Sequence, residues 1–162
     1  MALDTLRAQP NQNTFKVTFY NRDDIYLEKL IKQKFSASFM NNSKWVKLIT
    51  ALVENSSRIK ECKVKPIWDD TESKRHLCLD KNTQFGFDFY DTAMEAMVSG
   101  EPTGWYAYKE IEWLDFPAVT NSINNNFPVQ QDLQFIKSII DKLGQYKLEL
   151  THDNLRLYAY LR

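Results

Sequence analysis

The sequence predicts an α+β fold in which three to four helices pack on one face of a mainly antiparallel sheet. Apolar residues recur at helical spacing in some segments and alternate with polar residues in others, so both element types are expected. The predicted helices do not alternate regularly with the predicted strands, which disfavours a doubly wound parallel sheet. A chain of 162 residues has the length of one domain, so we expect a single domain over residues 1–162.

The N-terminal third is predicted to hold two helices after a loosely ordered start. Residues 1–20 are polar apart from a short alternation that ends at Phe19, and we expect an extension or an edge strand there. Apolar residues then recur at helical spacing over 23–35 and 43–55. Ser43 is expected to cap the second helix, because its hydroxyl can accept a hydrogen bond from a first-turn amide.

The middle of the chain has the periodicity of strands. Alternation predicts a strand over 62–68, a short strand near 76–79, and a strand over 85–89 whose three phenylalanines face the core. Residues 91–99 are expected to form a short helix that ends at a glycine.

The segment GWYAYKEIEWLDFP, residues 104–117, combines aromatic and acidic residues. If it is a strand, alternate residues lie on opposite faces. We expect Trp105 and Trp113 to belong to the core. The other face would present to solvent Tyr106, Tyr108, Glu110 and Glu112.

The C-terminal quarter is predicted to form a helix and a β-hairpin. Apolar residues at helical spacing place the helix over 130–143, and Gly144 would end it. The alternating segments that follow predict two short strands, with a turn at Asp153 and Asn154.

The charge of the chain sums to zero but is unevenly distributed. Residues 1–65 hold 12 Lys and Arg against 6 Asp and Glu, whereas residues 66–116 hold 4 against 11. A neutral whole argues against a general nucleic-acid binder. A separated acidic segment suggests a partner with a basic surface. The alternative is that folding mixes these charges on a solvated surface.

Known catalytic and cofactor signatures are missing from the sequence. The four glycines do not form a phosphate-binding loop, and His76 and His152 lack the spacing of metal ligands. Cys62 and Cys78 lack CxxC spacing and fit apolar strand positions in a reduced cytosol. We therefore expect no catalytic residue, no metal and no cofactor.

The N-terminus and hydropathy exclude two further classes. The first fifteen residues contain no apolar core segment typical of a signal peptide, and no run of the sequence has the apolar length of a membrane span. We expect a cytoplasmic protein without membrane association, and the sequence leaves its oligomeric state open.

Two alternative functions remain open. Glu110 and Glu112 share one predicted strand face, so they could act as an acid and base pair, with His76 or His152 nearby. Such a small enzyme would need these groups to converge in a deep cleft. A regulatory nucleic-acid adaptor would instead need a basic face built from Lys29, Lys32, Lys34, Lys44 and Lys47.

Binding of a protein partner has stronger support than catalysis. Tyrosines beside glutamates offer a broad aromatic area with orienting charges, a combination suited to interface anchors. A nearby acidic loop would extend this surface. The predicted partner contacts are Asp69, Asp70, Glu72, Tyr106, Tyr108, Glu110 and Glu112.

Two segments resemble a family of small bacterial proteins. FMNNSKWVKL, residues 39–48, is similar to a helix that starts with Met-Asn-Asn, Ser or Thr, Lys and Trp. YKEIEWLDFP, residues 108–117, is similar to a strand with Ile-Glu-Trp and a following proline. Proteins of this appearance resemble immunity proteins that accompany bacterial polymorphic toxins. The resemblance implies a non-enzymatic protein that binds a cognate toxin and occludes its active site or substrate path.

Overall fold

The computed structural model describes residues 25–70, 75–90, 106–120 and 127–162, without the side chains at 89, 90 and 106. The predicted edge strand at 14–20 and the predicted helix at 91–99 lie outside the described residues.

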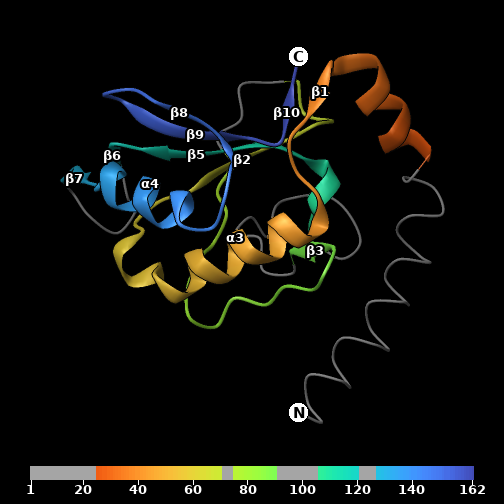
Figure 1. The fold of residues 1–162 in the computed structure, drawn as a ribbon. Helices are drawn as coiled ribbons and strands as arrows, with labels where there is room; N and C mark the ends of the chain where they lie inside the picture. Colours follow the sequence, from red (N-terminus) through yellow and green to blue (C-terminus); the bar gives the residue numbers. More distant parts are fainter. Residues whose placement is uncertain (1–24, 71–74, 91–105, 121–126) are drawn as a thin grey trace, which may run out of the picture.

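A four-stranded antiparallel sheet forms the centre of the fold. Its order is β2 (Lys63–Pro66), β5 (Ile111–Pro117), β9 (Asn154–Tyr158) and β8 (Lys147–Leu150). Helices α3 (Asn42–Glu54) and α4 (Leu133–Asp141) lie on the same side of this sheet (Figure 1). The predicted α+β class is therefore confirmed.

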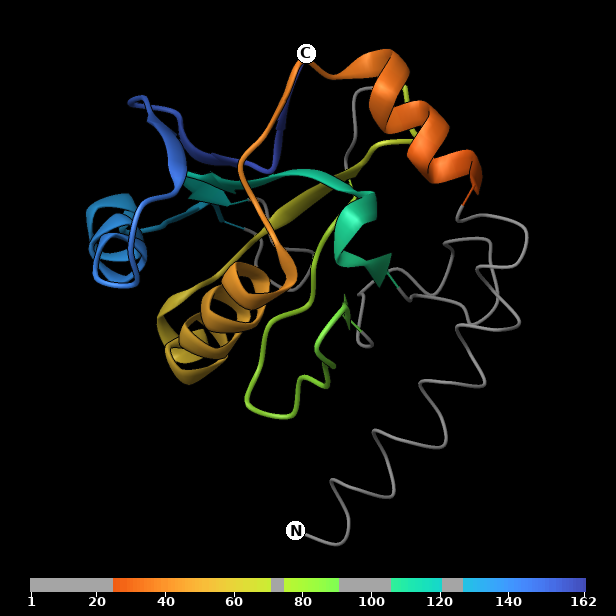
Figure 2. The same cartoon turned by 45° about the vertical axis from the view of Figure 1, so that its right-hand side comes forward.

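Short elements connect and extend this central layer. A helix that includes residues 25–34 lies beyond the end of the sheet, near the C-terminal end of the chain (Figure 2). Three two-stranded pairs are β1 (Ala37–Ser38) with β10 (Tyr160–Leu161), β3 (Phe89–Tyr90) with β4 (Tyr106–Ala107), and β6 (Val119–Thr120) with β7 (Val129–Gln130). Two single-turn helices occur among the described residues, η2 (Ser56–Arg58) and η3 (Tyr108–Glu110).

The core lies between the sheet and the helices α3 and α4. Leu114 of β5 and Leu157 of β9 are cross-strand partners and are fully buried. They belong to one cluster with Leu48 of α3 and Ile136 of α4, which are buried as well. Alternate residues of β5 and β9 thus face the helices, and the intervening residues face the opposite side of the sheet. No described helix is long and apolar enough to cross a membrane.

An irregularity at the start of β5 changes which side chains face outward. Lys65 of β2 pairs with Trp113, but Pro66 pairs with Ile111, so Glu112 has no partner residue on β2. A residue inserted in this way forms a β-bulge, which re-aims the side chains next to it. The single turn η3 directly precedes β5 and breaks the alternation further. The prediction of one regular two-faced strand over 104–117 is therefore wrong for the described residues 106–117, and the predicted core residue Trp105 lies outside the described part of the chain.

Other element boundaries also differ from the predictions. Helix α4 begins at Leu133 because Val129 and Gln130 pair with β6 instead. Phe87 is 57% exposed, so the prediction that it faces the core is wrong. The turn after α4 is as predicted, since Gly144 has a φ of +141°, which glycine adopts without strain.

The N-cap of α3 is Asn41, whereas the sequence pattern suggested Ser43. The Asn41 side chain accepts a hydrogen bond from the Lys44 amide at 2.8 Å. Ser43 lies inside the first turn of the helix, where its hydroxyl is not placed to cap. The helix therefore starts earlier than predicted, directly after the Met-Asn pair.

Two substitutions distinguish these capping assignments. Asn41→Ala should lower the free energy of unfolding by about 1 kcal/mol, because a first-turn amide loses its acceptor. Ser43→Ala should change it by under about 0.5 kcal/mol. Urea denaturation followed by circular dichroism measures both. A larger loss for Ser43→Ala than for Asn41→Ala would contradict the cap described above.

Candidate functional site

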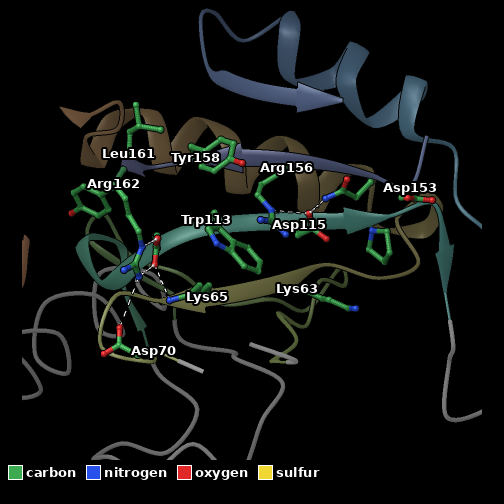
Figure 3. Close-up of a pocket in the computed structure, with 14 residues that line it drawn as sticks. Lys63, Lys65, Asp70, Trp113, Asp115, Asp153, Arg156, Tyr158, Leu161 and Arg162 are labelled. Carbon is green, nitrogen blue, oxygen red and sulfur yellow. Dashed lines mark hydrogen bonds and ion pairs between the residues drawn. The ribbon is translucent and has the colours of Figure 1, made fainter. Parts of the chain in front are cut away.

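An open groove of about 880 Å³ lies on the sheet face opposite the core. Strands β2, β5 and β9 supply its floor, and the C-terminal residues Leu161 and Arg162 form one end. Figure 3 shows Trp113, Asp115 and Arg156 pointing into it from neighbouring strands. No described helix supplies a residue to the groove. The sheet thus buries one face and presents the other.

The middle of the groove is an aromatic and ionic cluster. The guanidinium carbon of Arg156 lies 4.0 Å from the centroid of the Trp113 ring. Arg156 Nε donates to Asp115 Oδ1 at 3.0 Å, and Asn154 Nδ2 donates to the same oxygen at 2.5 Å. Tyr158 is the cross-strand partner of Trp113. Each of these side chains is therefore held in place from at least one neighbouring strand.

A nearly buried carboxylate holds one end of the groove together. Glu112 accepts from Lys65 Nζ at 2.8 Å and from Arg162 Nε and Nη2 at 2.8 and 3.1 Å. The side chains of Glu112 and Lys65 are only 6% and 11% exposed. Burial alone would raise the pKa of Glu112, but the hydrogen bonds and charges of Arg162 and Lys65 outweigh it and hold the pKa below its ordinary value. Glu112 is thus an ionised structural anion at neutral pH.

The same end of the groove joins the first described helix to the C-terminal residue. Lys34 donates to Asp70 at 2.5 Å, and Arg162 Nη2 lies 3.9 Å from the same carboxylate. The hydrogen bond from Lys34 and its charge lower the pKa of Asp70. Nearby, the Tyr160 hydroxyl donates to the Lys109 carbonyl at 2.9 Å, and burial raises the pKa of Tyr160 to about 12. Tyr160 therefore stays a neutral donor.

Most of the predicted partner contacts are not solvent-exposed. Tyr108 is fully buried, stacks on Trp45 with a centroid distance of 5.6 Å, and donates its hydroxyl to the Gly86 carbonyl at 2.7 Å. Glu110 is 3% exposed and accepts from Trp68 Nε1 at 3.0 Å and the Ala107 amide at 2.7 Å. The prediction that Tyr108 and Glu110 face solvent is therefore wrong, because η3 turns both toward the core.

The remaining predicted contacts lie in different surroundings. Asp69 is 9% exposed and is paired with Arg75 at 2.8 Å, whereas Asp70 and Glu112 line the groove. Glu72 and the side chain of Tyr106 lie outside what the structure describes. The structure therefore places two of the seven predicted residues in one candidate site.

The sequence analysis did not predict several residues of the groove. Trp113 was expected in the core, but it is only partly buried and faces the groove, as do Arg156 and Tyr158 of β9. The alternation in the predicted strand places Arg156 and Tyr158 on one face, so the sequence was sufficient to predict that these two side chains share a face. Their juxtaposition with Trp113 follows from the pairing of β5 with β9, which the sequence does not state.

The convergence expected of a carboxylate-dependent enzyme does not occur in the described part of the chain. His76 Nδ1 lies 3.2 Å from Glu61 beside a separate cavity of about 120 Å³. His152 is 91% exposed by its side chain, and neither histidine lines the groove. The described residues contain no group of three or more His, Cys, Asp or Glu placed to hold a metal.

The structure places both cysteines and two of the lysines that were predicted for a basic face. Cys62 and Cys78 are free thiols, and burial raises the pKa of both.

Lys34 binds Asp70 and the Ile67 carbonyl, whereas Lys44 binds the carbonyls of Phe39 and Gln145. These two lysines are thus directed at different parts of the chain and do not share one free basic surface.

Removing the charge of Glu112 should destabilise the protein. In Glu112→Gln the nearly buried Lys65 ammonium loses its anion, so we expect the free energy of unfolding at pH 7 to fall by about 3 kcal/mol. Urea denaturation measures the loss. The control Glu149→Gln removes an exposed carboxylate from β8 and should cost under about 0.5 kcal/mol. Equal losses for the two variants would contradict the role given to Glu112.

The lowered pKa of Glu112 also predicts sensitivity to acid. The folded state releases this proton more readily than the unfolded chain, so the contribution of Glu112 is complete above the unfolded pKa, about 4.3. It is lost as the pH falls through the lower folded pKa. Stability of the wild type should therefore decrease more steeply below about pH 4.3 than that of Glu112→Gln. Chemical denaturation at a series of pH values measures both slopes, and parallel curves would contradict this assignment.

Comparison with known proteins gives a family but no described activity. No curated protein and no solved structure matches the chain. One family model matches residues 27–162, a range that begins within the first described helix and contains every residue of the groove. The chain therefore belongs to DUF6678, a family of unknown function.

Proposed function

We propose that this protein is a non-enzymatic immunity protein that binds a cognate bacterial toxin with the groove face of its sheet. Binding would occlude the active site or the substrate path of the toxin. The action is proposed for the bacterial cytoplasm, where a toxin made by the same cell would otherwise reach its target.

The observation that carries this proposal is the cluster of Trp113, Arg156 and Tyr158 on the open sheet face. Tryptophan, tyrosine and arginine are the residues most enriched at the energetic centres of protein interfaces. Here all three line one groove, and Trp113 is the direct neighbour of Tyr158 across the sheet. A partner that covered this cluster would bury a large aromatic area together with one strong hydrogen-bond donor.

The cluster is also ordered before any partner binds. Arg156 is fixed by Asp115 and by the Trp113 ring, and Asp115 is fixed in turn by Asn154. A side chain that is already held in one conformation loses less entropy on association. Preorganisation of this kind supports recognition of a partner by the folded sheet surface.

The segments that resemble immunity-type proteins divide between the core and the groove. Residues 39–48 lead into and begin α3, whose Trp45 and Leu48 are buried. Residues 108–117 contain β5, which supplies Glu112, Trp113 and Asp115 to the groove. The second segment therefore links the family resemblance to the proposed binding surface.

Several carboxylates of residues 66–116, the segment from which a basic partner surface was expected, are compensated within the chain. Within this segment, Asp69, Glu112 and Asp115 already form ion pairs with cations of the chain, and Glu110 accepts from Trp68 and Ala107. Carboxylates compensated in this way attract an external cation weakly. The proposal therefore requires no basic surface on the toxin.

The decisive experiment is co-expression with the product of the neighbouring gene. We expect that product to kill cells lacking this protein and to be harmless in its presence, with the two purified proteins forming a complex. A neighbouring product that is harmless alone, or equally lethal with this chain present, would reject the proposed function.

Substitutions in the groove test the surface. Trp113→Ala and Tyr158→Ala should each raise the dissociation constant of that complex about 30-fold, which corresponds to about 2 kcal/mol for an interface anchor. Isothermal calorimetry measures the affinity, and thermal unfolding checks that each variant is folded. Trp113→Phe serves where the alanine variant is unstable, with an expected smaller loss in the same direction.

Tyr26→Ala is the matched control, because Tyr26 is 52% exposed and does not line the groove. It should leave the affinity unchanged. If the folded groove variants bind the toxin with wild-type affinity, the binding surface must lie elsewhere on the protein.

A further inference from the structure

The ionic groups of the groove strands compensate one another with one exception. Glu112 is shared by Lys65 and Arg162, and Asp115 is bound by Arg156. Lys63 of β2 also lines the groove, but its ammonium makes no hydrogen bond or ion pair within the described part of the chain. On β2, β5 and β9, the charge left uncompensated is therefore positive.

The pairing of the strands explains why Lys63 remains without an anion. Lys63 lies directly opposite Asp115 across β2 and β5, the position where opposite charges ordinarily pair. Asp115 is instead bound by Arg156 at 3.0 Å and by Asn154 at 2.5 Å from the other side. Figure 3 shows the Lys63 side chain directed away from Asp115. Two donors on β9 thus bind one oxygen of the carboxylate opposite Lys63, and Arg156 neutralises its charge in place of Lys63.

The surroundings of Lys63 favour an anion from outside the chain. Lys63 is only partly exposed, so the field of its ammonium is screened less than that of a fully solvated lysine. Asp153 also lines the groove, but its side chain is 80% exposed and lies 3.3 Å from His152. Asp153 therefore remains largely hydrated, and it does not act as the anionic partner of Lys63.

An apolar surface lies one step away from this ammonium. Trp113 is the residue opposite Lys65, so it is the diagonal neighbour of Lys63 on the same sheet face. Diagonal neighbours in antiparallel strands are about 7–8 Å apart, within reach of adjacent side chains of a bound segment. The arrangement suits a carboxylate placed next to an aromatic or aliphatic group.

We propose that the groove binds an exposed segment of the partner protein in which an Asp or Glu pairs with Lys63 and a neighbouring apolar side chain covers Trp113. This inference rests on the proposed function for the identity of the partner as a protein toxin. It adds the chemistry of recognition: the partner contributes an acidic residue here, the opposite of what the charge of residues 66–116 suggests.

Short peptides test this chemistry without any knowledge of the toxin. The probes are three blocked tetrapeptides, Gly-Phe-Glu-Gly and its Gln and Lys analogues, titrated into the full-length protein labelled with ¹⁵N. The Trp113 indole and the amides of β2 and β9 report binding at the groove by nuclear magnetic resonance. We expect the Glu peptide to bind about tenfold more tightly than the Gln peptide, the ratio that corresponds to one charge-assisted hydrogen bond.

Two variants assign that preference to one ammonium. Lys63→Met should abolish the difference between the Glu and Gln peptides while retaining the Phe-dependent shifts at Trp113. Lys147→Met removes an exposed lysine from the neighbouring strand β8 and should leave the preference intact. Added salt should reduce the preference in the wild type, because the pair is electrostatic.

Several results would overturn the inference. They are equal or tighter binding of the Lys peptide, absence of groove shifts with every peptide, and a Glu preference that persists in Lys63→Met. Tighter binding of a single-stranded oligonucleotide at these resonances would assign the groove to phosphate and would also overturn it. If the co-expression experiment fails but the peptides show the expected preference, only the identity of the partner as a toxin is rejected. If co-expression succeeds but the peptides show no Glu preference, only the acidic contact is rejected.

Discussion

The ion cluster formed by Lys65, Glu112 and Arg162 is the interaction on which the arrangement of the groove depends. It joins β2, the bulged start of β5 and the C-terminal residue through a carboxylate that is almost inaccessible to water. A buried ion pair of this kind contributes little net stability, but the loss of one partner is costly because it leaves the other charge buried. The cluster therefore fixes geometry: it holds β2, the start of β5 and Arg162 together, and Arg162 also approaches Asp70, which pairs with Lys34 of the first described helix.

Alternation of side chains along β5 and β9 gives the central sheet two different faces. Toward α3 and α4, β5 and β9 present leucine and phenylalanine side chains that are fully buried. On the opposite face, charged side chains lie beside Trp113 and Tyr158, and Lys65, Glu112, Asp115 and Arg156 are paired within the chain. A face with matched charges resists nonspecific association, while its aromatic residues remain available to a complementary surface. Lys63 is the group at which a partner's charge would be distinguished.

The local signals were sufficient for much of the fold. Helical spacing located α3 and the helix that includes residues 25–34, alternation located β2 and the β8–β9 hairpin, and Gly144 marked the end of α4. These features depend on residues close together in the chain, where periodicity and backbone preference act directly. The N-cap was displaced by two residues because Asn41 and Ser43 are both good capping residues, and only the backbone conformation selects between them.

Patterns within the sequence were enough to predict the α+β class, the helices α3 and α4, and the strands β2, β8 and β9. Which side chains of the aromatic segment face outward depends on the folded chain, since the turn η3 and the bulge at Glu112 interrupt the two-residue period. The groove depends on it as well, because only the pairing of β5 with β9 brings Trp113 beside Arg156 and Tyr158, which lie more than forty residues away from it in sequence. Strand pairing is a long-range property: a pattern within one segment shows which residues share a face, but not which distant face lies beside them.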